Sequence, residues 1–80
     1  MQIIRKISEN EMQQINPKII EKLGAECIIT SGSVENCSGR VRYNVVTFHK
    51  ELPEETLKRI GNIVKEQFAD EVFYLGRKIA

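Results

Sequence analysis

Hydrophobic and polar residues follow several short patterns along this chain, and the points where one pattern gives way to the next predict its elements. Gln2 to Ile7 carries apolar residues at positions 3, 4 and 7, a spacing that fits a short strand or a helical turn. Ser8-Glu9-Asn10-Glu11 is a capping box, in which Ser8 and Glu11 each bond the backbone N–H of the other. Because a helix therefore starts at Ser8, residues 2 to 7 are predicted to form a separate strand.

The first predicted helix carries apolar residues at spacings of three and four, which indicates a stripe that faces the core. Pro17 interrupts this stripe. Because proline lacks an N–H and crowds the preceding turn, Asn16-Pro17 either kinks the helix or ends one short helix and caps the next. Gly24 suits the residue that ends the helix. The residues of the stripe are Met12, Ile15, Ile19, Ile20 and Leu23.

Two further segments, Ala25 to Thr30 and Val41 to Phe48, have the β-branched and alternating composition of strands. Between them, Ser31-Gly32-Ser33 and Asn36-Cys37-Ser38-Gly39 are rich in turn-forming residues. We therefore predict an antiparallel hairpin with a long polar tip over residues 31–39. Its register stays open, because the tip could be loop or ladder.

A second helix is predicted to begin at Leu52-Pro53-Glu54-Glu55, where proline occupies the first turn and two carboxylates favour the helix dipole. Gly61 lies on its buried stripe and permits a close backbone approach. Val72 to Leu75 is predicted to be a strand, which either ends at Gly76 or continues to Ile79. The stripe of this helix consists of Leu57, Ile60, Val64 and Phe68.

The order strand, helix, strand, strand, helix, strand is that of the ferredoxin-like β-α-β-β-α-β sandwich. We expect a single α+β domain over residues 1–80, with a four-stranded antiparallel sheet and two helices on one face. Eighty residues supply enough buried surface for one core but not for two. Such an arrangement leaves the other face of the sheet uncovered.

Alternation divides the strand over residues 41–48 between the two faces of the sheet. The odd-numbered residues make the better core, so the even-numbered residues are expected on the uncovered face. If Phe73, Leu75 and Ile79 point inward, Tyr74 and Lys78 project from the same uncovered face, joined by either Arg5 or Lys6. The predicted partner-binding residues are Arg42, Asn44, Val46, Phe48, Tyr74 and Lys78.

Val46 and Phe48 on an uncovered face indicate a partner surface. We therefore predict a small non-enzymatic binding or regulatory module that acts through protein–protein contacts, with a homodimer as its simplest form. The open sheet face and the 31–39 tip are its expected contact regions. The alternative is a single-stranded nucleic-acid-binding domain, in which cations follow the phosphates and rings stack on bases. A net charge of +1 supplies little steering for that alternative.

Candidate chemistry is sparse. His49 is the single histidine, and a dyad with Cys27 would require the thiol to lose its proton to the imidazole. A buried structural Cys27 is the favoured interpretation. The chain lacks the paired ligand spacing of zinc sites. We expect no enzymatic activity, no metal and no cofactor. Without a long apolar run or signal-peptide anatomy, the chain is expected to be cytoplasmic and not to bind membranes.

Overall fold

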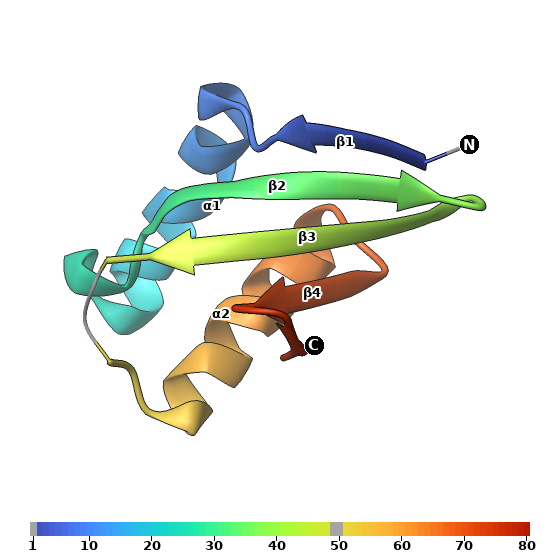
Figure 1. The fold of residues 1–80 in the computed structure, drawn as a ribbon. Coiled ribbons are helices and arrows are strands. Elements are labelled where there is room, and N and C mark those ends of the chain that lie inside the picture. The colour runs from blue at the N-terminus through green and yellow to red at the C-terminus, as the bar shows by residue number, and fades with distance from the viewer. Residues whose placement is uncertain (1, 49–50) are drawn as a thin grey trace.

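The structure is a computed structural model that describes residues 2–48 and 51–80. These residues form two α-helices, one short 3₁₀ helix and a sheet (Figure 1). The elements along the chain are β1 (Gln2–Lys6), α1 (Glu9–Leu23), the short 3₁₀ helix η1 (Ala25–Cys27), β2 (Ile29–Cys37), β3 (Arg40–Thr47), α2 (Glu54–Gln67), β4 (Glu71–Tyr74) and β5 (Arg77–Lys78).

Among the described residues the sheet has five strands, which lie side by side in the order of the sequence. β1 and β2, β2 and β3, and β4 and β5 pair antiparallel, whereas β3 and β4 pair parallel. The α+β class is confirmed, but the four-stranded antiparallel sheet of a ferredoxin-like sandwich was wrong. The physical reason is that α1 returns the chain to the end of the sheet where β1 stops (Figure 1), so that β2 pairs directly with β1.

The capping box at the start of α1 is confirmed, since the Ser8 hydroxyl accepts from the Glu11 N–H at 3.1 Å and the Glu11 carboxylate accepts from the Ser8 N–H at 3.0 Å. The helix continues through Pro17 to Leu23. Asn16 therefore caps no second helix. Its side-chain amide instead accepts from the N–H of Ile29 at 2.9 Å and donates to the carbonyl of Ile29 at 3.0 Å, which attaches α1 to the start of β2.

The antiparallel hairpin of β2 and β3 is confirmed, but its first strand was predicted over the wrong residues. Of Ala25 to Thr30, the first three form the 3₁₀ helix η1, and β2 begins only at Ile29. β2 runs without a loop to Cys37, and the turn consists of Ser38 and Gly39 alone, with φ values of 55° and 80°. Positive φ at both central residues is typical of the two-residue turn that matches strand twist. Of the two alternatives for residues 31–39, loop or ladder, the structure therefore shows the ladder, which ends in a two-residue turn. Polar residues here are strand residues, because β1 and β3 supply backbone hydrogen bonds on both sides.

The last strand does not continue to Ile79, which the sequence had left open. β4 ends at Tyr74, and the chain reverses through Leu75 and Gly76 into β5. The last two residues then return to β4, where the Ile79 N–H donates to the Val72 carbonyl at 2.8 Å. They pack on α2 at Gly61, where an added Cβ would lie 2.9 Å from the Cβ of Ala80. The predicted close approach at Gly61 is confirmed.

Both helices pack on one side of the sheet, as predicted (Figure 1). The odd-numbered residues of β3 face the helices, and Tyr43 and Val45 are buried there. No helix among the described residues has the length and apolar character needed to cross a membrane. The core joins Ile15 and Ile19 of α1, Ile60 and Val64 of α2, and Val34, Tyr43, Val45 and Val72 of the sheet.

Candidate functional site

The side of the sheet that carries no helix is called the open face. Residues paired across neighbouring strands share a face, so the register defines its members. Arg42 lies beside Glu71, Asn44 beside Phe73, and Phe73 beside Lys78. The open face consists of Gln2, Ile4 and Lys6 of β1, Ser31, Ser33, Glu35 and Cys37 of β2, Arg40, Arg42, Asn44 and Val46 of β3, Glu71 and Phe73 of β4, and Lys78 of β5.

The face assignment was correct for Arg42, Asn44, Val46 and Lys78, which all lie on the open face. For Tyr74 it was wrong, because Tyr74 pairs with Val45 on the helix-covered side. The error comes from the assumption that Phe73 points inward, which reverses every face along β4. The binding roles of these residues stay predictions.

Glu71 is the centre of a charge cluster on the open face. Its carboxylate lies 3.0 Å from Arg42 Nε, 3.3 Å from Arg40 Nη2 and 3.8 Å from Lys78 Nζ. The carboxylate is buried, whereas the three cations are about half exposed. Each cation can therefore meet a ligand while Glu71 holds it in place.

The guanidinium of Arg42 also lies over the ring of Phe73, 5.5 Å from its centroid. This cation–π contact orients Arg42 across β4. Sequence reasoning missed Arg40, Glu71 and Phe73. The signal for Arg40 was present, since it is two residues from Arg42 on the same strand. Glu71 and Phe73 could be placed on the open face only if the two faces of β4 were assigned correctly.

Beyond the last pair of β3 and β4, the described residues form an apolar hollow of about 500 Å³. Phe48 lies on its rim and is 47% exposed. The hollow brings Val46, Phe48 and Tyr74 together, although Tyr74 reaches it from the covered side. The apolar lining consists of Val46, Phe48, Leu52, Leu57, Tyr74 and Leu75, with Thr47, Glu51 and Arg77 beside them.

Leu75 is the most unusual residue of this hollow. It is 76% exposed at the turn between β4 and β5, and its φ is 48°. Left-handed backbone is unfavourable for a bulky residue, by about 1–2 kcal/mol. Sequence reasoning missed Leu75 as a surface residue because it was expected to point inward from a strand. The dipeptide Leu75-Gly76 is a weak turn signal, since Asn or Asp normally precedes the glycine.

The covered side carries a second polar cluster. The Glu11 carboxylate accepts from Arg5 Nη1 at 2.6 Å and Arg5 Nη2 at 2.9 Å, and from the Tyr43 hydroxyl at 2.7 Å. The bonds from Arg5 hold the pKa of Glu11 far below its usual value, together with those from Ser8 and Tyr43 and against the effect of burial. Burial and the ionised Glu11 raise the pKa of Tyr43 to about 12.

These shifts move both pKa values further from neutral pH, near which a general acid or base would titrate. The cluster links β1, α1 and β3 through side-chain hydrogen bonds. Cys27 is buried, with its Sγ 3.7 Å from the Leu23 carbonyl, and His49 lies outside the described residues. Across residues 2–48 and 51–80, no three His, Cys, Asp or Glu side chains are grouped to hold a metal ion.

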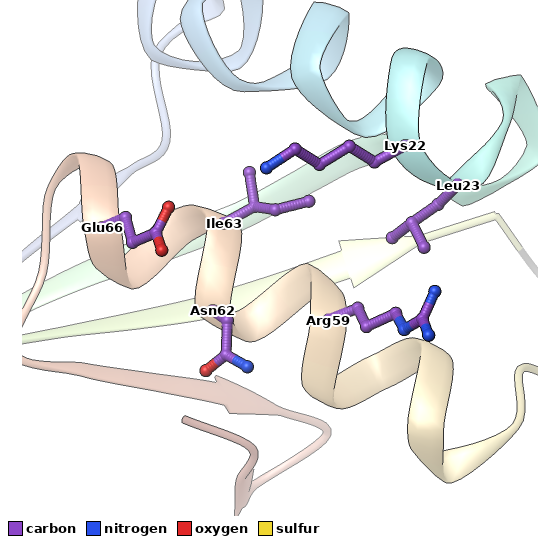
Figure 2. Close-up of a pocket in the computed structure, with 6 residues that line it drawn as sticks. All are labelled: Lys22, Leu23, Arg59, Asn62, Ile63 and Glu66. Atoms are coloured by element: carbon purple, nitrogen blue, oxygen red, sulfur yellow. The ribbon is translucent and has the colours of Figure 1, made fainter.

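A groove of about 420 Å³ also runs between the two helices on the covered side (Figure 2). Its floor is apolar, and Lys22 extends from α1 across the groove toward Ile63. Arg59 at the other end is bonded to Glu55 at 3.3 Å. Charges of both signs on flexible side chains provide no converging set of donors for a ligand. The lining residues are Lys22, Leu23, Arg59, Asn62, Ile63 and Glu66.

Comparisons with protein-family models, with curated proteins and with solved structures found no match for this chain. The candidate site therefore rests on its own geometry, which has two separate parts at opposite ends of β4. One is the charge cluster around Glu71, and the other is the apolar hollow around Leu75.

Proposed function

We propose that this protein is a small non-enzymatic binding module that takes a protein partner on the open face and in the apolar hollow. The observation that carries the proposal is Leu75, an exposed leucine in a left-handed turn position. The turn itself would be more stable with asparagine or glycine. Strain at an exposed residue supports a functional role, and burial of the leucine against a partner would offset its cost.

The surroundings of Leu75 support a protein partner. Val46 and Phe48 extend the apolar surface, and the cations around Glu71 lie farther along β3 and β4, at the opposite end of their pairing, on the open face. Protein interfaces combine an apolar centre with a polar rim, and a few central residues carry most of the binding energy. Residues 31–39, as strand and turn, add Ser33 and Glu35 to the same open face.

The test is Leu75→Asn, because asparagine tolerates left-handed backbone. We expect a free energy of unfolding about 0.5–1 kcal/mol higher than that of the wild type, together with at least a tenfold loss of affinity for the partner. Urea unfolding measures the first effect. Affinity capture with mass spectrometry, followed by titration of the purified partner, measures the second.

The matched control is Ile20→Asn, since Ile20 is an exposed apolar residue of α1 away from the hollow. This change should leave affinity for the partner unchanged. A partner that binds Leu75→Asn as tightly as the wild type would show that the hollow is not the site. Equal losses in both variants would point to a non-specific effect of surface polarity.

A second candidate function, single-stranded nucleic-acid binding, is favoured by one observation, the gathering of Arg40, Arg42 and Lys78. Glu71 and Glu35 lie among these cations on the open face and would repel phosphates, so the protein partner is the primary proposal. Glu71→Gln removes one of the carboxylates and should strengthen nucleic-acid binding if the cations serve phosphates. Fluorescence anisotropy with a labelled oligonucleotide at low salt is the test. No binding by either the wild type or Glu71→Gln excludes this function.

A further inference from the structure

The outer edge of β1 presents backbone groups that no neighbouring strand uses. Within the described residues, β2 is the single strand that pairs with β1 (Figure 1). The Ile7 N–H donates to the Gly32 carbonyl at 3.0 Å, and direction alternates along an antiparallel strand. The backbone N–H and C=O groups of Ile3 and Arg5 therefore form hydrogen bonds with β2. The backbone N–H and C=O groups that point outward are those of Gln2, Ile4 and Lys6.

β1 has few of the features that normally protect an edge strand. Ile4 is 63% exposed on the open face, and Ile3 is 58% exposed on the covered side. The strand contains no proline, and its pairing with β2 is continuous over all five residues. Edges of this kind are templates for another strand. Its charged residues, Arg5 and Lys6, lie together at one end.

We propose that β1 pairs antiparallel with β1 of a second copy of this chain, about a two-fold axis at Ile4. Ile4 then faces Ile4 of the second copy as a hydrogen-bonded pair. Gln2 faces Lys6, and Ile3 faces Arg5, so no like charges are opposed. The Lys6 carbonyl already accepts from Arg5 Nη1 at 3.2 Å, and its second lone pair serves the new strand.

Side-chain charge and the number of paired residues select this register over its neighbours. An axis at Arg5 would place two arginines opposite each other, which is destabilising. An axis at Ile3 would pair only Gln2, Ile3 and Ile4 among the described residues. The axis at Ile4 uses all five residues and brings the two exposed Ile4 side chains into contact across the new strand pair, in a self-complementary, isologous interface.

Pairing of the two β1 strands also fixes how the open faces of the two copies are arranged. A two-fold axis between antiparallel neighbours is perpendicular to the sheet, so the open faces of both copies point the same way. The two sheets become one ten-stranded layer, twice the five strands of one chain, with one apolar hollow near each outer edge. Such a dimer would bind a partner at two equivalent places.

The first test is mass against concentration, by light scattering or sedimentation between about 10 μM and 1 mM. The mass should rise from 9.2 kDa toward twice that value. Ile4→Lys places two ammonium groups on the axis and should weaken dimerisation by about tenfold or more. The matched control Ile20→Lys changes an exposed isoleucine of α1 in the same way and should leave dimerisation unchanged.

The second test uses the wild-type chain and does not depend on a folded variant. Amide hydrogen exchange at Ile4 should slow as concentration rises, whereas the N–H of Arg5, bonded within the chain, should be protected at every concentration. A constant mass of 9.2 kDa, a dimer that survives Ile4→Lys, or equal losses in both lysine variants would each overturn the proposal. Leu75→Asn should not change the mass, so a failure of the proposed partner site can be distinguished from a failure of the proposed dimer.

Discussion

Glu11 and Glu71 are two carboxylates in similar settings that serve their protein differently. Their side chains are almost equally buried, and both lie beside arginine. Glu11 accepts from both Nη atoms of Arg5, from the Tyr43 hydroxyl, and from the backbone N–H and hydroxyl of Ser8, at 2.6 to 3.0 Å. Glu71 meets Arg42 at 3.0 Å, but Arg40 and Lys78 only at 3.3 and 3.8 Å.

The difference lies in what the donors do when the carboxylate is removed. Around Glu11, the buried Tyr43 hydroxyl and the start of α1 depend on the carboxylate for their hydrogen bonds. Around Glu71, the three cations are half exposed and can turn to water. A polar cluster whose groups are all hydrogen-bonded inside the fold fixes how secondary-structure elements pack together. A surface cluster with longer contacts leaves its charged groups available to a ligand.

The largest expected effect is that of Glu11→Ala. It removes half of the capping box, the partner of Arg5 and the acceptor for Tyr43, and should lower the free energy of unfolding by about 2–3 kcal/mol. Glu9→Ala in the same helical turn is the control, because Glu9 is exposed, and its effect should stay within about 0.5 kcal/mol. Urea unfolding of both variants measures the difference. Equal effects would mean that Glu11 acts only through the helix dipole.

The pH dependence of stability should follow from the same cluster. The pKa of Glu11 is lowered in the folded state, so its contribution is complete above the usual value of 4.5 and is lost as pH falls below it. The pKa of Tyr43 is raised to about 12, so its contribution is complete below its usual value of 10 and is lost as pH rises above it.

Thermal unfolding across pH checks this prediction. The stability difference between the wild type and Glu11→Ala should shrink as pH falls below about 4.5, because the unfolded chain then binds a proton at Glu11 that the folded state, with its lowered pKa, does not. A difference that stays constant down to pH 2 would show that the ion pair contributes nothing and that the loss comes from packing.

The smallest expected effect is that of Glu71→Ala. Its hydrogen bonds are to exposed cations, which regain hydration, so the free energy of unfolding should fall by only about 0.5–1 kcal/mol. Urea unfolding beside Glu11→Ala gives the direct comparison. A loss as large as that of Glu11→Ala would mean that Glu71 is a structural residue, and that the cations around it are held for the fold rather than for a ligand.

Local signals in the sequence predicted most of the elements. The capping box at Ser8 and the proline before Glu54 placed the starts of both helices, and alternation from residue 41 to 47 assigned β3 to its two faces. The β2–β3 turn was harder to place, because polar residues such as Ser31 and Ser33 occupy a central strand whose outward side is exposed. Composition alone does not separate an exposed strand face from a loop.

The candidate site was predicted in part. Arg42, Asn44, Val46 and Lys78 lie on the open face, since strand parity is a local property. Leu75 could not be found by pattern, because its importance comes from a turn that its residue type disfavours.

The sequence by itself determined where both helices begin, roughly where β1, β3 and β4 lie, and which side of β3 is buried, because capping and alternation act between residues close along the chain. Only the tertiary structure decided that β2 pairs with β1 and that β4 turns back at Leu75. Strand order depends on contacts between residues far apart in the sequence, whose free energies are set by how helices and strands pack together.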